Sequence, residues 1–173
     1  AVASGNSYDL PVGDASAMRL AEINNIAGGT SSLEAVFNLG VSNNSPLNIP
    51  NEGIYDQVNT FGHWNISADA NPTSYDAVAH TTGFGGLVDN QFGVVKRPTG
   101  GAASTWETGG GTFVAHTIAD GIAERTGITN GFSDFGIATG SGPITAGIKI
   151  DAKIFLAGAF AAGSMSTALS SFA

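Results

Sequence analysis

The chain of 173 residues contains no cysteine and few charged side chains. Without cysteine the fold has no disulfide, no thiolate ligand for zinc and no thiol nucleophile. Charged residues make up 12% of the chain, about half of the usual ~25%. Ser, Thr, Asn and Gly must therefore supply most of the polar surface, and a hydrophobic core alone must hold the fold together.

Basic residues are especially scarce: 6 Lys and Arg stand against 14 Asp and Glu, which gives a formal net charge of −8. Such a chain repels a phosphate backbone, so we expect no nucleic-acid partner. No apolar run reaches the ~18 residues of a transmembrane helix, so we expect no membrane insertion. The first residues, AVAS, are small, as at a mature end left by signal-peptide cleavage. We expect a secreted, extracellular or cell-surface protein.

Signatures of catalysis and of cofactor binding are also lacking. The sequence has no Gly-x-Ser-x-Gly elbow, no Walker or dinucleotide glycine loop and no EF-hand loop. His63, His80 and His116 are widely spaced within expected strands, and their spacing does not indicate a shared metal site. We therefore expect no enzyme, no catalytic residue, no metal site and no cofactor.

Acidic residues are the remaining source of chemistry. Three acids lie near expected turns or on outward strand positions: Glu107, Asp120 and Glu124. We expect them to be solvated surface charges rather than the paired carboxylates of a glycosidase. Four other acids lie near expected loops and leave adventitious Ca²⁺ binding open: Asp69, Asp76, Asp89 and Asp134.

Glycine and period-two alternation are abundant. The 25 glycines cluster in pairs and triplets, which is typical of tight turns. Between them, apolar and polar residues alternate, as in strands with one buried and one wet face. The expected strands cover residues 18–26, 32–41, 61–68, 74–82, 91–97, 105–108, 112–118, 123–128, 132–138 and 148–156.

This pattern predicts an all-β fold: a single antiparallel β-sandwich of immunoglobulin-like (Ig-like) type with little or no helix. One domain is expected over residues 1–173, with a long loop over 42–53. A weak helical pattern begins at Asp14, but strand is favoured for its second half, up to Ile23.

The segment 148–156 has the plainest alternation, with isoleucines on one face and Lys149, Asp151 and Lys153 on the other. Residues 157–173 follow, and most of their side chains are small or polar. We expect this segment to be an extended tail that takes part in assembly. A strand with an unpartnered apolar face invites pairing with another chain, so copies of itself are the expected partners. The predicted assembly residues are Ile148, Ile150, Ile154, Leu156, Phe160, Met165, Leu169 and Phe172.

The two tryptophans receive different predictions. Trp64 shares an apolar face with Ile66, so we expect it in the core. Trp106 stands between Thr105 and Glu107 in a Gly-rich context, so we expect it to be exposed and to be a candidate contact for surface glycans.

Several phrases, in order, resemble recurring phrases of large Bacteroidota surface proteins. They are the LPVGDA opening at residue 10, HWNI at 63, FGVVKR at 92 followed by TW at 105, SDFGIA at 133, and KIFLAGAF at 153 followed by GSMSTAL at 163. The resemblance implies a secreted or cell-surface β-sandwich module of adhesin or filament-like proteins exported by the type IX pathway, and it carries no catalytic residues. His63, where an aromatic is usual, and Ala138, where the closing Gly is usual, depart from the pattern.

These observations favour a non-enzymatic extracellular structural protein, a surface or filament subunit that self-assembles by strand or tail exchange between copies. A glycan-binding or adhesion module is one alternative, with Trp106 as its contact. A viral capsid or decoration protein is another, since it would share the β-fold, the low charge and the self-assembly.

Overall fold

Strands form almost all of the regular structure in the computed structural model, which describes residues 2–42, 44, 47, 49, 52 and 55–140. The chain divides into two units, Ala1–Pro143 and Ile144–Ala173, and every described residue belongs to the first. The predicted single domain over 1–173 stays a prediction. The eight predicted assembly residues, from Ile148 to Phe172, and the tail at 157–173 lie outside the described residues.

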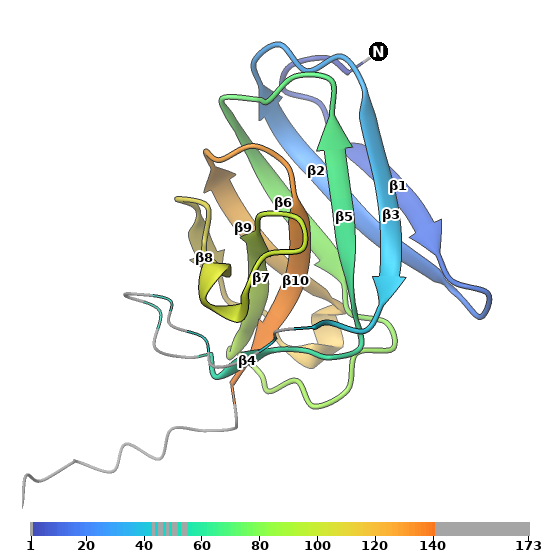
Figure 1. The fold of residues 1–173 in the computed structure, drawn as a ribbon, viewed down its shortest axis with the longest axis vertical. Helices are drawn as coiled ribbons and strands as arrows, with labels where there is room; N and C mark the ends of the chain where they lie inside the picture. Colours follow the sequence, from blue (N-terminus) through green and yellow to red (C-terminus); the bar gives the residue numbers. More distant parts are fainter. Residues whose placement is uncertain are drawn as a thin grey trace, which may run out of the picture. The chain divides into compact units, whose positions relative to one another are not determined.

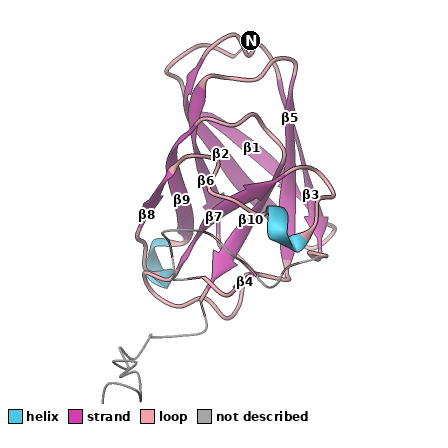
Figure 2. Ribbon diagram, turned by 60° about the vertical axis from the view of Figure 1, so that its left-hand side comes forward, coloured by secondary structure: helices cyan, strands magenta, loops and turns pink. Residues whose placement is uncertain are grey.

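Ten strands and two short 3-10 turns are described, and Figure 2 shows how strands dominate the fold. They are β1 (Tyr8–Gly13), β2 (Met18–Ala27), β3 (Leu33–Leu39), β4 (Gln57–Val58), β5 (Gly62–Ala68), β6 (Ser74–His80), β7 (Phe92–Arg97), η1 (Ala103–Thr105), β8 (Thr112–Val114), η2 (Ile118–Asp120), β9 (Ile122–Ile128) and β10 (Asp134–Thr139).

The strands form two antiparallel sheets (Figure 1). Sheet A has the order β1-β2-β6-β9-β8. Sheet B has the order β3-β5-β10-β4, and β7 also pairs with β10. β7 pairs with all six residues of β10 along one side of that strand. Along its other side, β10 pairs first with β5, at Asp134 and Phe135, and then with β4, at Ala138 and Thr139. The predicted antiparallel all-β sandwich is confirmed, whereas its Ig-like type stays a prediction.

A first core lies between the sheets because the strands alternate as the sequence predicts. Trp64 and Ile66 of β5 are 0% and 2% exposed, which confirms the prediction that Trp64 packs in the core. The ring of Phe37 meets that of Trp64 edge-on, with centroids 5.0 Å apart. From sheet A, Ile23 and Ile128 close the same core at 0% exposure.

A second core lies on the outer face of sheet B and explains why every residue of β7 and β10 is buried. Val95 and Ala138 point to this side, where Val58, Tyr55 and Trp106 cover them. A strand buried on both faces loses the apolar–polar alternation, as FGVVKR does. Sheet B therefore carries a layer of connecting segments on the face that the sandwich leaves outside.

The hairpin between β1 and β2 depends on Asp14. Its carboxylate accepts hydrogen bonds from the amides of Ser16 and Ala17, at 2.7 and 3.1 Å, and from the Ser16 hydroxyl. These bonds, led by those from Ser16, lower the pKa of Asp14 from 3.8 to about 2. Asp14, where the weak helical pattern begins, thus closes a β-turn, and the preference for strand over the following residues, now β2, is confirmed.

Two expected strands differ in the structure. The prediction of a strand over 105–108 is wrong, because η1 ends at Thr105 and only Glu107 makes an isolated bridge, to Lys96. The strand over 112–118 ends at Val114, and Ile118 begins η2. Two strands, β1 and β4, were not expected. The predicted loop over 42–53 falls mostly outside the described residues.

Candidate functional site

All four basic side chains of the described region are buried: Arg19, Lys96, Arg97 and Arg125 are 6%, 4%, 2% and 0% exposed. Of the acidic side chains described, only Asp134 is buried. The charged surface of this part of the chain is consequently all acidic, apart from protonatable histidines. Basic residues hold the fold together, and the surface favours a cationic partner.

The pair Arg97 and Asp134 joins β7 to β10 on the outer face of sheet B. Arg97 Nε lies 3.3 Å from Asp134 Oδ2, and each residue is 2% exposed. The Asn65 amide and the Gly100 backbone N–H also donate to this carboxylate, at 2.9 and 3.0 Å. Burial opposes ionisation, but these bonds, the charge of His63 and the hydrogen bond from Arg97 outweigh it and hold the pKa of Asp134 below its usual value.

The same arginine fastens two connecting segments to the sheet. Arg97 Nη1 donates to the carbonyl oxygens of Ser42 and Gly101, at 2.9 and 2.8 Å. Its guanidinium lies 4.5 Å from the ring centroid of Trp106. The phrases HWNI, FGVVKR with TW, and SDFGIA, which carry the sequence resemblance, therefore meet in one contact network.

Trp106 is the one predicted ligand contact that the structure describes, and its predicted exposure is wrong. The side chain is 2% exposed and belongs to the second core. Its ring packs over Gly136 of β10, where a Cβ would lie 3.1 Å from Cη2. A buried indole has no face to stack on a sugar, so Trp106 is a core residue.

A second buried arginine anchors a connecting segment to sheet A. Arg125 Nη1 and Nη2 each lie 2.6 Å from a carboxylate oxygen of Glu52, a bidentate pair. Its Nε donates to the Val94 carbonyl oxygen at 2.6 Å and thus bridges the two sheets. Burial raises the pKa of the neighbouring Tyr55 phenol, which keeps it protonated.

Each histidine has an acidic neighbour, and His116 has two, because its Nδ1 also lies 3.5 Å from Asp120 Oδ2. His80 Nε2 lies 2.6 Å from Glu22, and His116 Nε2 lies 3.1 Å from Glu124. His63 Nε2 lies 4.0 Å from Asp134. Among the described residues no group of three or more His, Cys, Asp or Glu side chains is arranged to hold a metal ion. His63 and His80 lie in strands as predicted, whereas His116 follows β8.

Three of the acids considered for Ca²⁺ accept hydrogen bonds from backbone amides, and one of these, Asp76, lies in β6 rather than in a loop. Asp69 accepts from the amides of Ser31 and Ser32, at 2.9 and 3.0 Å. Asp76 accepts from the Gly127 amide and Asp89 from the Ile118 amide, both at 2.7 Å. Asp134 belongs to the arginine network. Backbone donors thus occupy oxygens that a cation would need.

Asp120 Oδ2 accepts from the Thr117 amide at 2.7 Å in the turn of η2, and Glu107 accepts from the Asn130 side chain at 2.9 Å. Glu124 is paired with His116. None of the three acids considered for glycoside cleavage is paired with another carboxylate in these contacts.

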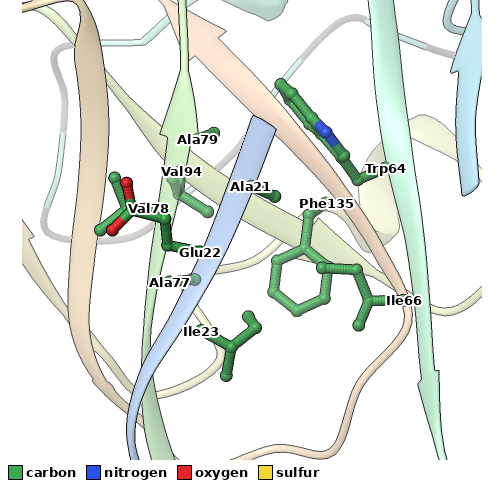
Figure 3. A pocket seen from close by; sticks show the side chains of 10 residues that line it. All are labelled: Ala21, Glu22, Ile23, Trp64, Ile66, Ala77, Val78, Ala79, Val94 and Phe135. Carbon is green, nitrogen blue, oxygen red and sulfur yellow. The ribbon is translucent and has the colours of Figure 1, made fainter. Parts of the chain in front are cut away.

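Figure 3 shows the small cavity of about 10 Å³ between the sheets. Ala21, Ile23, Trp64, Ile66 and Phe135 turn apolar side chains toward it. Small-molecule sites measure roughly 300 to 1,000 Å³, so this cavity is a packing defect and holds no ligand.

The described sheets have five edge strands, and four of them are protected. β1 contains Pro11, which has no N–H to donate. β4 and β8 are only two and three residues long. β7 exchanges two backbone hydrogen bonds with Glu107 through Lys96, at 2.9 and 2.7 Å. Proline, short length and coverage are the usual means of blocking edge pairing.

β3 is the described edge that lacks such protection. Its seven residues, LEAVFNL, include no proline and no lysine, and its ladder with β5 has no bulge. Gly40 N–H donates to the Phe61 carbonyl of this ladder, at 2.8 Å. Because alternate residues of an antiparallel pair face the partner, Glu34, Val36 and Asn38 bond to β5. The backbone groups of Ala35, Phe37 and Leu39 therefore face the free edge.

The side chains around this edge are also incompletely covered. Val36 and Leu39 are 56% and 64% exposed. On the inner side, β1 and β3 are neighbours across the sandwich (Figure 1). The apolar residues where these two strands meet, called the β1–β3 seam, are only half-buried. They are Tyr8, Leu10, Val12, Leu33 and Ala35.

Beside the free edge, on the outer side of β3 and β5, lies a shallow hollow of about 230 Å³. Its lining includes the carboxylate-bearing residues Glu34 and Asp69 together with Ser32 and Ser67.

The sequence contained a signal for the free edge of β3 that the strand prediction did not use: Val36 is an apolar residue at a position that the alternation assigns to the wet face.

Comparison with protein-family models, curated proteins and solved structures gives no match for this chain. Within the described residues, no helix combines the length and the apolar character that crossing a bilayer requires.

Proposed function

We propose that the protein is a non-enzymatic extracellular structural subunit whose copies associate by adding a strand to the free edge of β3. One observation carries this proposal: among the edge strands that the structure describes, β3 is unprotected by any described segment, whereas β1, β4, β7 and β8 are each blocked. A long edge with exposed apolar side chains is a template for strand addition from another chain.

The half-covered seam supports the same function. A strand placed beside β3 would turn every second side chain inward, over Leu33 and Ala35, and would shield apolar surface that one copy leaves in contact with water. Backbone hydrogen bonds along Ala35, Phe37 and Leu39 would supply affinity without a deep pocket. Both features suit assembly better than catalysis.

The roles of the polar residues support a structural protein. The buried basic residues and the candidate catalytic or metal-binding acids are engaged in contacts that hold turns, loops and sheets. The resemblance to Bacteroidota surface modules supports an extracellular location, and three of its phrases, HWNI, FGVVKR with TW, and SDFGIA, meet in the Arg97 network.

A charge on the free edge tests the proposal. Val36→Lys places an ammonium group on the outward face of β3, a device by which natural edges avoid pairing. Met18→Lys is the matched control, because Met18 is 63% exposed and belongs to β2 of sheet A, not to β3. Sedimentation velocity over a concentration series should show association of the wild type and of Met18→Lys. Val36→Lys should weaken association at least tenfold, about 1.4 kcal/mol. A monodisperse wild-type monomer, or equal effects of the two lysines, would reject this function.

A further inference from the structure

We propose that the strand added to β3 is residues 148–156 of a second copy, with Lys149 and Lys153 on the same face as Glu34. This inference rests on the function proposed above and names the partner segment. The segment has the period-two pattern that a strand on a half-covered sheet edge requires.

Charge is the first argument. Of the six basic residues in the chain, four are buried in the described sandwich, and the other two are Lys149 and Lys153. The described surface offers only acidic charge, and the hollow next to β3 presents Glu34 and Asp69. The two lysines of this segment are therefore the chain's own cations for that surface, and opposite charges on adjacent strands stabilise pairing.

The pleat is the second argument. Neighbouring strands share one pleat, so residues opposite each other point to the same face. If the lysines lie on the outer face with Glu34 and Val36, the isoleucines at 148, 150 and 154 must point inward, over the β1–β3 seam. One placement thus puts the isoleucines over the apolar seam and the two lysines, with Asp151 between them, on the acidic outer face.

The division of the chain is the third argument, and it favours a second copy as the donor. Residues 148–156 belong to the unit Ile144–Ala173, whereas β3 belongs to the unit Ala1–Pro143. A donor strand outside the unit that it completes is suited to exchange between copies, and repeated exchange in one direction yields a filament.

Engineered cysteines test the pairing directly, because the natural chain contains none. One chain carries Val36→Cys, and a second chain of different tag length carries Lys149→Cys, Asp151→Cys or Lys153→Cys. Opposed residues of antiparallel strands have Cα atoms roughly 4.5 to 5.5 Å apart, within the range that a disulfide spans. After mixing and mild oxidation, we expect a mixed disulfide-linked dimer from at least one of the three.

The matched controls are Ile150→Cys and Ile154→Cys in the second chain. Their side chains are expected on the inner face, opposite to Val36, so the yield should fall at least tenfold. Equal yields from both sets of positions would indicate random collision and would overturn the proposed pairing.

Other products separate this inference from the proposed function. A Val36→Cys chain that links to itself while the mixed product is absent would show β3 paired with β3; the donor is then wrong and edge assembly stands. A chain carrying Val36→Cys and Asp151→Cys that closes on itself at low concentration, again without mixed product, would show that its own segment fills the edge, which overturns the second-copy donor. A wild type that stays monomeric, together with the absence of a linked product from every cysteine pair, overturns both.

Discussion

Asp134→Asn is the substitution whose effect follows most directly from the structure. The carboxylate receives three donors: Arg97 Nε at 3.3 Å, the Gly100 amide at 3.0 Å and the Asn65 amide at 2.9 Å. An asparagine keeps the volume but replaces one acceptor oxygen by an NH₂ group, which must then face a donor. It also removes the negative charge beside a guanidinium that is 2% exposed.

Removing one partner of a buried ion pair costs about 3–5 kcal/mol of folding free energy. Arg97 keeps its bonds to the carbonyls of Ser42 and Gly101 and its contact with Trp106, so we expect the lower end, about 3 kcal/mol. Urea unfolding followed by tryptophan fluorescence measures this loss, because both tryptophans are buried. The midpoint should fall while the m-value stays constant.

Asp9→Asn is the control, because Asp9 is exposed on β1 opposite Glu22 and should change stability by less than about 0.5 kcal/mol. Adding Arg97→Met to Asp134→Asn should cost less than Arg97→Met alone, because both substitutions remove the same pair. A loss below about 1 kcal/mol for Asp134→Asn would refute the assigned role of this pair.

Two further predictions concern acid stability and packing. The folded pKa of Asp14, about 2, lies below its ordinary 3.8, so its stabilisation is present above about pH 4 and is lost as pH falls toward 2. In the Asp14→Asn variant, the midpoint of urea unfolding should therefore decline less between about pH 4 and pH 2 than it does in the wild type. Gly136→Ala would put a Cβ 2.6 Å from Val58 Cγ1 and should cost about 1–3 kcal/mol in urea unfolding, whereas Gly29→Ala meets nothing within 4 Å and should be nearly neutral.

The sequence predicted strands best where one face is buried and the other is wet. The expected segments 32–41 and 61–68 became β3 and β5 with their boundaries shifted by a residue or two. Of the inward set, Phe37, Trp64 and Ile66 are buried as the alternation requires, whereas Leu33 and Ala35 at the sheet edge are half-buried and Leu39 is exposed. Local periodicity suffices here because the pleat alone assigns each side chain to a face.

Prediction failed where distant segments decide the outcome. β1 contains Pro11, which argues against a strand until the strand is known to lie at a sheet edge. Trp106 is buried because connecting segments form a layer over sheet B, and no pattern around residue 106 encodes that layer. The indirect signal was FGVVKR, a run without a wet face, which indicates cover on both sides.

The candidate site was only partly accessible to sequence reasoning. The apolar alternation of 148–156 indicates a strand that needs a partner, but the position of the accepting edge follows only from the strand order. Likewise, the burial of four basic residues leaves an acidic surface that the net charge of −8 alone does not locate.

Amide hydrogen exchange along β3 tests the central claim most directly, because one strand carries both the test and its control. The amides of Ala35, Phe37 and Leu39 face the free edge, whereas those of Val36 and Asn38 bond to β5. As protein concentration rises, the edge-facing amides should become protected while protection of Val36 and Asn38 stays constant. Edge-facing amides that exchange equally fast at every concentration, in a protein that nonetheless associates, would contradict strand addition at β3.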